Sequence, residues 1–103
     1  MSVAETFIVF VEKASQIIES HKDDGAALAL ALRAHIEAEN PGFQAAVKAL
    51  EAMPAEEQEE VLGAIGERLE AAMELMSEGS AKNLNVPEML EFGALMDAAV
   101  ANL

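Results

Sequence analysis

Apolar residues recur at every third or fourth position along most of this 103-residue chain, which places them on one side of an α-helix. The stripes run through residues 3–18, 43–50, 61–76 and 89–103. One stretch, Leu28 to Leu32, alternates like a strand, but its sequence LALAL holds no β-branched residue, and alanine favours helix. The spacing therefore predicts an all-α fold with essentially no sheet.

Capping residues mark the helices in the first half of the chain. Ser2 is followed at the third position by Glu5, which is the pattern of a capping box at a helix start. Asp23 or Asp24 is placed to cap a second helix. Pro41 is expected to end that helix and to open a short third one, because a proline inside a helix removes a hydrogen bond but fits its first turn.

The same signals divide the second half. Pro54 opens a long helix, Gly79 is expected to end it, and Asn85 with Glu88 forms a second capping box after a loop. The expected helices cover residues 3–21, 25–39, 41–52, 54–77 and 86–102. We therefore expect residues 1–103 to form a single domain, a small bundle of four to five helices that run mostly antiparallel.

The chain is strongly acidic, with six Lys and Arg against nineteen Asp and Glu and a net charge of −13. Such a charge repels nucleic acid and anionic membranes, and it favours a basic protein as partner. The alternative is that the acidity serves solubility, or adapts the protein to a salty or acidic cell. The N-terminal apolar run is short and lacks a basic leader, so we expect a cytoplasmic protein.

Three apolar residues fall outside the main stripes. Ile8 and Val9 make the segment FIVFV apolar all round, and Leu30 projects on the polar side of its helix. A second buried face built from these residues and the neighbouring alanines predicts a homodimer with two-fold symmetry. A monomer that buries them internally is the alternative. The candidate interface comprises Ile8, Val9, Ala27, Leu30, Ala31 and Ala34.

Two glycines, Gly63 and Gly66, lie on the polar side of the long helix. Each costs about 1 kcal/mol relative to alanine in a helix interior. Either the helix bends at the two glycines, or a neighbouring backbone approaches them, or they have drifted onto an exposed face. They form a weaker candidate for a second contact with a partner.

Catalytic and metal-binding patterns are missing from the sequence. The di-iron bundle pattern pairs each histidine with a glutamate three residues earlier, but those positions hold Ile18 and Leu32. His35 and Glu39 share a helix face, and two ligands are fewer than a metal site needs. The chain has no cysteine and no glycine-rich phosphate loop. We therefore expect no cofactor and no enzyme activity.

Methionine is frequent for a chain of this size. Because the methionines continue the helical stripes, we expect them in the core, although methionine also lines adaptable binding grooves. The residues concerned are Met53, Met73, Met76, Met89 and Met96. The sequence as a whole predicts a non-catalytic interaction or regulatory protein that uses an acidic helical surface. The alternatives are a binder of a small apolar ligand between methionine-lined helices and, third, a metal-dependent enzyme.

Overall fold

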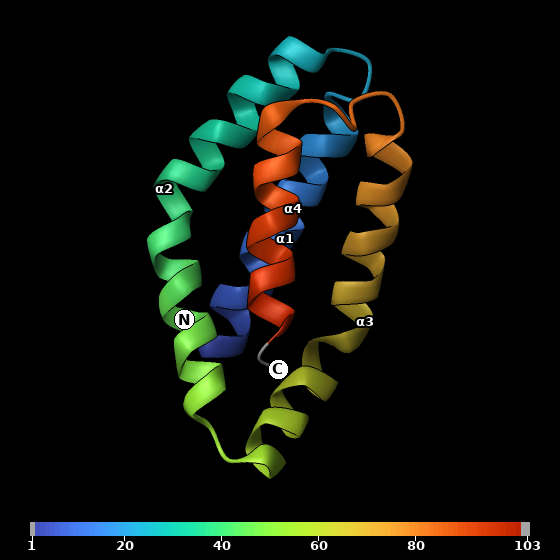
Figure 1. Ribbon diagram of the computed structural model, residues 1–103. Coiled ribbons are helices and arrows are strands. Elements are labelled where there is room, and N and C mark those ends of the chain that lie inside the picture. Colours follow the sequence, from blue (N-terminus) through green and yellow to red (C-terminus); the bar gives the residue numbers. More distant parts are fainter. Residues whose placement is uncertain (1, 102–103) are drawn as a thin grey trace.

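The computed structural model describes residues 2–101, which form four α-helices and no strand. The helices are α1 (Val3–Ser20), α2 (Gly25–Ala52), α3 (Ala55–Ser80) and α4 (Pro87–Ala101). They run alternately up and down, with α1 behind α4 and with α2 and α3 on either side (Figure 1). The predicted all-α bundle is confirmed, except that residue 102 of the expected last helix lies outside the described residues.

The described helices form three packed pairs, which leaves one side of the bundle open. Among the described residues, α1 packs against α2 and α3, and α2 packs against α4, whereas α3 and α4 do not form a closely packed pair. Because α1 has a neighbour on two sides, a single apolar stripe does not cover its contacts. Ile8 is fully buried within the chain, so its expected place on a separate face toward a second copy is wrong.

An aromatic cluster forms the centre of the core. The ring of Phe10 on α1 stacks on Phe43 of α2, with centroids 4.2 Å apart, and on His35, 4.8 Å away. Phe7 reaches Phe43 at 5.2 Å, and Phe92 of α4 reaches Phe10 at 5.9 Å. All four phenylalanines of the chain therefore join α1, α2 and α4 in one cluster.

The N-terminal ends of α1 and α2 form as the sequence predicts. The Ser2 hydroxyl accepts a hydrogen bond from the Glu5 backbone N–H at 3.1 Å. The Asp24 carboxylate accepts one from the backbone N–H of Ala27, also at 3.1 Å. These bonds satisfy amide groups that the helix itself leaves without partners.

One helix takes the place of two expected ones, because α2 continues through Pro41. Ile36 before the proline and Phe43 after it are both buried in the same core, and this packing holds the two halves in line. Pro41 itself is exposed, as is Glu37, so water can satisfy the Glu37 carbonyl that the missing N–H leaves free. Packing here outweighs the local cost of a proline.

Gly79 does not end α3, which continues to Ser80. Gly79 lies against the last turn of α1, since a Cβ at this position would lie 2.9 Å from Glu19 Cα. The glycine therefore permits close approach of two helices instead of forming a C-cap.

The connection between α3 and α4 is held by Asn83 and not by the expected cap Asn85. Asn83 is buried, and its side-chain amide donates to the Lys22 carbonyl at 2.8 Å. Its own backbone carbonyl accepts from the Val86 N–H at 3.1 Å. This residue joins the two loops at one end of the bundle.

Arg68 of α3 links that helix to α1 through two carboxylates. Its guanidinium donates to both oxygens of Glu12, at 2.6 and 3.0 Å, and to Glu5 at 2.6 Å. These hydrogen bonds from Arg68 hold the pKa of the Glu12 carboxyl below its ordinary value of 4.5. A lowered pKa in the folded state stabilises the fold above that ordinary value, and the stabilisation is lost as the pH falls through the lowered pKa.

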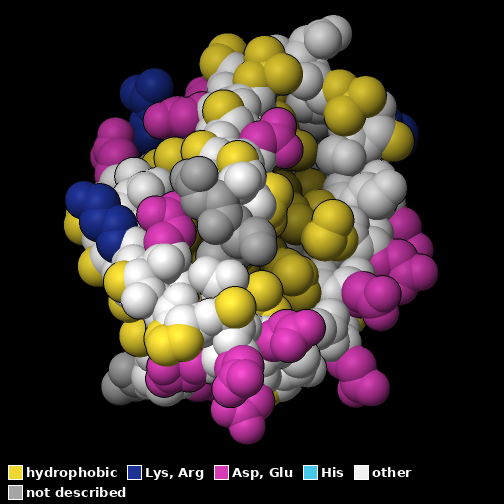
Figure 2. Space-filling view, turned by 60° about the horizontal axis from the view of Figure 1, so that its bottom comes forward, with side chains coloured by type: hydrophobic (Ala, Val, Ile, Leu, Met, Phe, Trp, Pro, Cys, Tyr) yellow, Lys and Arg dark blue, Asp and Glu magenta, His cyan; other side chains and the backbone are white. Residues whose placement is uncertain are grey.

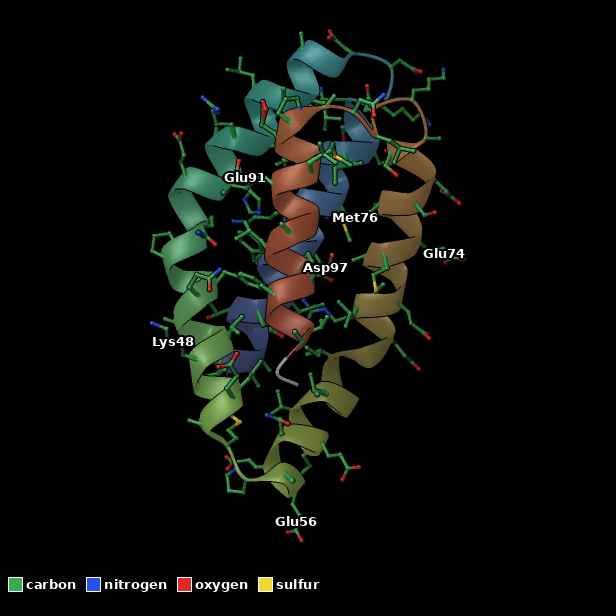
Figure 3. All side chains as sticks on the ribbon, in the orientation of Figure 1. Lys48, Glu56, Glu74, Met76, Glu91 and Asp97 are labelled. Atoms are coloured by element: carbon green, nitrogen blue, oxygen red, sulfur yellow. The ribbon has the colours of Figure 1, made fainter. Side chains whose placement is uncertain are left out.

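We therefore expect Arg68→Met to lower the free energy of unfolding at neutral pH. The difference in this free energy between parent and variant should shrink as the pH falls below 4.5, the ordinary pKa of the Glu12 carboxyl. Urea unfolding of parent and variant at a series of pH values measures this difference. Lys48→Met is the control, because it removes one positive charge from an exposed site on α2 (Figure 3). A deficit that stays constant with pH would show that the Arg68–Glu12 pair does not act in this way.

Candidate functional site

The open side of the bundle, between α3 and α4, forms an apolar groove of about 290 Å³. Met73 and Met76 project into it from α3, and Met89 and Met96 from α4. The full lining consists of Ile18, Met73, Met76, Ser77, Ser80, Met89, Phe92, Gly93, Met96 and Asp97. We call this site the methionine groove.

Helical spacing brings these side chains to one surface. Met89, Phe92 and Met96 follow each other at intervals of three and four residues, which places them on one face of α4. The ring of Phe92 is buried at the inner side of the groove, whereas Met73 is 56 % exposed at its outer side. Figure 2 shows hydrophobic side chains in a hollow right of centre, with acidic side chains along its right and lower edges.

The expectation that the methionines form the core is wrong for Met73, which is exposed, and holds in part for the other three methionines of the groove. Met76, Met89 and Met96 are half-buried and pack against the core from one side, and Met73 is exposed. Met53, at the end of α2, is half-buried and does not line the groove. Helical periodicity gives the direction of a side chain, but only the spacing of α3 and α4 decides whether another helix covers it.

Acidic residues stand on both rims of the methionine groove. On α3, Glu70 lies one turn before Met73 and borders the same surface hollow as Met73, and on α4 Asp97 of the groove lining follows Met96. In Figure 3, Met76 and Asp97 lie in the space between α3 and α4, and Glu74 extends from the outer side of α3. The groove is therefore apolar inside and negatively charged at its edges.

The residues of the predicted dimer interface do not lie in this groove, and they do not share one environment. Leu30 is 74 % exposed on α2, and Ala34 is exposed one turn further along. Val9, Ala27 and Ala31 are half-buried. A homodimer through α1 and α2 stays a prediction, with Leu30 as its most exposed apolar residue and without Ile8.

Gly63 and Gly66 have no neighbouring backbone close to them, since a Cβ at either position would meet nothing within 4 Å. Figure 1 shows α3 changing direction in its first half, the part of the helix that contains both glycines. Of the interpretations open from the sequence, a bend agrees with this picture. A second contact at these glycines stays a prediction.

The histidines have separate surroundings. His35 is buried, and its Nε2 donates to the Phe10 carbonyl at 2.9 Å. His21 is half-buried at the end of α1. Over residues 2–101, no three His, Asp or Glu side chains stand close enough together to bind a metal ion. Within the same residues, no helix has the length and apolar character needed to cross a bilayer.

Comparisons of the chain with protein-family models, with curated proteins and with solved structures gave no match.

Proposed function

We propose that this chain is a non-catalytic interaction protein whose methionine groove binds an apolar segment of another protein. The observation that supports this most strongly is the open side of the bundle, where four methionines line a surface that no element among residues 2–101 covers. Methionine side chains are unbranched and polarisable, so they adapt to different apolar partners. Open apolar grooves of this kind commonly bind an amphipathic helix of a partner protein.

The length of the apolar surface along α4 agrees with a helical occupant. Met89 and Val100 stand eleven residues apart on α4, which corresponds to about 16 Å at about 1.5 Å per residue. Val100 lies one turn beyond Met96 and is 51 % exposed, so it extends the apolar surface toward the end of the helix. About three turns of a bound helix fit along this length.

A variant pair tests the proposal. Met73→Ser should weaken binding of a fluorescein-labelled helical peptide of Leu, Ala and Gln roughly 10- to 100-fold, because burying one such side chain contributes about 1.5–3 kcal/mol. Leu30→Ser is the matched control, since it removes an exposed apolar side chain from a different face. Fluorescence anisotropy measures both. Equal affinities for parent and Met73→Ser, or a loss confined to Leu30→Ser, would contradict binding in the groove.

A small apolar ligand is the second candidate. The volume of about 290 Å³ lies near the lower end of the range for ligand pockets, about 300–1,000 Å³. Such pockets enclose most of their ligand, whereas the exposed Met73 leaves this groove open on one side. Native mass spectrometry of the purified protein distinguishes the two, because a retained small apolar compound would favour this second candidate.

A further inference from the structure

The helices that form the methionine groove carry most of the negative charge of the chain. Together α3 and α4 contain eleven acidic residues and a single basic residue, Arg68. Arg68 is already bonded to Glu5 and Glu12 of α1. The charge of the two groove walls is therefore not offset by cations of their own.

The basic residues of the other elements do not line the groove either. Lys22 pairs with Glu19 at 3.3 Å, and Lys82 pairs with Asp23 at 2.8 Å, both near the loops at one end of the bundle. Lys48 projects from α2 on the side away from α3 (Figure 3). An occupant of the groove thus meets acidic groups on the α3 rim and on the α4 rim, and the described lining offers it no cation.

We infer that the occupant of the methionine groove is a basic amphipathic helix of a partner protein, with Lys or Arg on both flanks of its apolar stripe. This inference rests on the proposed function and adds the chemistry of the partner to it. Its apolar stripe contacts Met73, Met76 and Met96, while its flanking cations face Glu70 on one rim and Asp97 on the other. A second copy of this chain fits poorly, because it would bring a net charge of −13 to an acidic surface.

The α4 wall leaves room for the backbone of such a helix. Gly93 lines the groove beside Asp97, and a Cβ at this position would meet nothing within 4 Å. A glycine on the wall lets an incoming helix approach α4 more closely than a larger residue would. The flexible methionines on either side can then adjust to the apolar side chains of the partner.

Three synthetic helical peptides test the inference, all with one leucine stripe and with flanking positions occupied by Lys, by Gln or by Glu. The Lys peptide should bind most tightly and the Glu peptide most weakly. Raising the salt from about 0.01 M to about 1 M, which shortens the Debye length from about 30 Å to about 3 Å, should weaken the Lys peptide and leave the Gln peptide nearly unchanged. Isothermal titration calorimetry gives the affinities.

The double variant Glu70→Gln with Asp97→Asn locates the effect. It should weaken the Lys peptide about 2- to 30-fold, the range for two exposed ion pairs, and leave the Gln peptide unaffected. Glu56→Gln with Glu57→Gln is the control, since it removes the same charge from the first turn of α3, far from the groove (Figure 3).

The possible outcomes separate the two proposals. Equal binding of all three peptides in the groove would overturn the basic helix and leave the proposed function standing. Tighter binding of the Glu peptide, or an equal loss of the Lys peptide in both double variants, would also overturn it. Binding of none of the three would overturn the proposed function itself.

Discussion

Replacing Phe43 by alanine should lower the free energy of unfolding by about 3–5 kcal/mol, the usual cost of removing a buried aromatic ring. Phe43 is fully buried, and its ring contacts both Phe7 and Phe10. The substitution therefore leaves a cavity where α1 and α2 meet. A loss of this size is a large part of the about 5–15 kcal/mol that a domain of this kind has in total.

Urea unfolding followed by far-ultraviolet circular dichroism measures the Phe43 effect. Phe43→Leu is the control, because it keeps an apolar side chain at the site and should lose less than Phe43→Ala. A loss of about 0.5 kcal/mol or less for Phe43→Ala, which is the range of an exposed site, would mean that the aromatic cluster is not the centre of the core.

Alanine substitutions at two glycines of the same helix should have opposite effects. In Gly79→Ala the new Cβ would lie 2.9 to 3.0 Å from backbone atoms of Ile18 and Glu19, so α1 and α3 must move apart. Overpacking of this kind costs about 1–3 kcal/mol, which outweighs the helix propensity that alanine adds. Gly63→Ala meets no atom within 4 Å, and it should stabilise the protein by about 0.5–1 kcal/mol.

Thermal unfolding of the two glycine variants reads this difference directly. The Tm of Gly79→Ala should fall below that of the parent, and the Tm of Gly63→Ala should rise above it. Equal stability of Gly79→Ala and Gly63→Ala would contradict the close approach of the last turns of α1 and α3.

Local signals in the sequence are sufficient for much of the fold. Ser2 and Asp24 cap their helices as expected, because a cap depends only on residues within one turn. Pro41 and Gly79 were misleading for the same reason. Both residues tend to end a helix. In this fold the helices continue through them because of contacts between α2, α1 and α3, which a local sequence pattern does not reveal.

The sequence offers a methionine-lined groove only as the alternative to a methionine core, and it does not decide between the two. The stripes of α3 and α4 correctly give the direction of Met73, Met76, Met89 and Met96, but the absence of close packing between the two helices is a property of the whole bundle. The burial of Ile8 follows in the same way from the central position of α1.

The most direct test of binding in the methionine groove is nuclear magnetic resonance of protein labelled with ¹³C at the methionine methyl groups. On addition of the Lys-flanked peptide, the methyl signals of Met73, Met76, Met89 and Met96 should shift together. The signal of Met53, which does not line the groove, should stay in place and serves as an internal control. Binding of the peptide with a shift of Met53, or with no shift of the four groove signals, would contradict the proposed function.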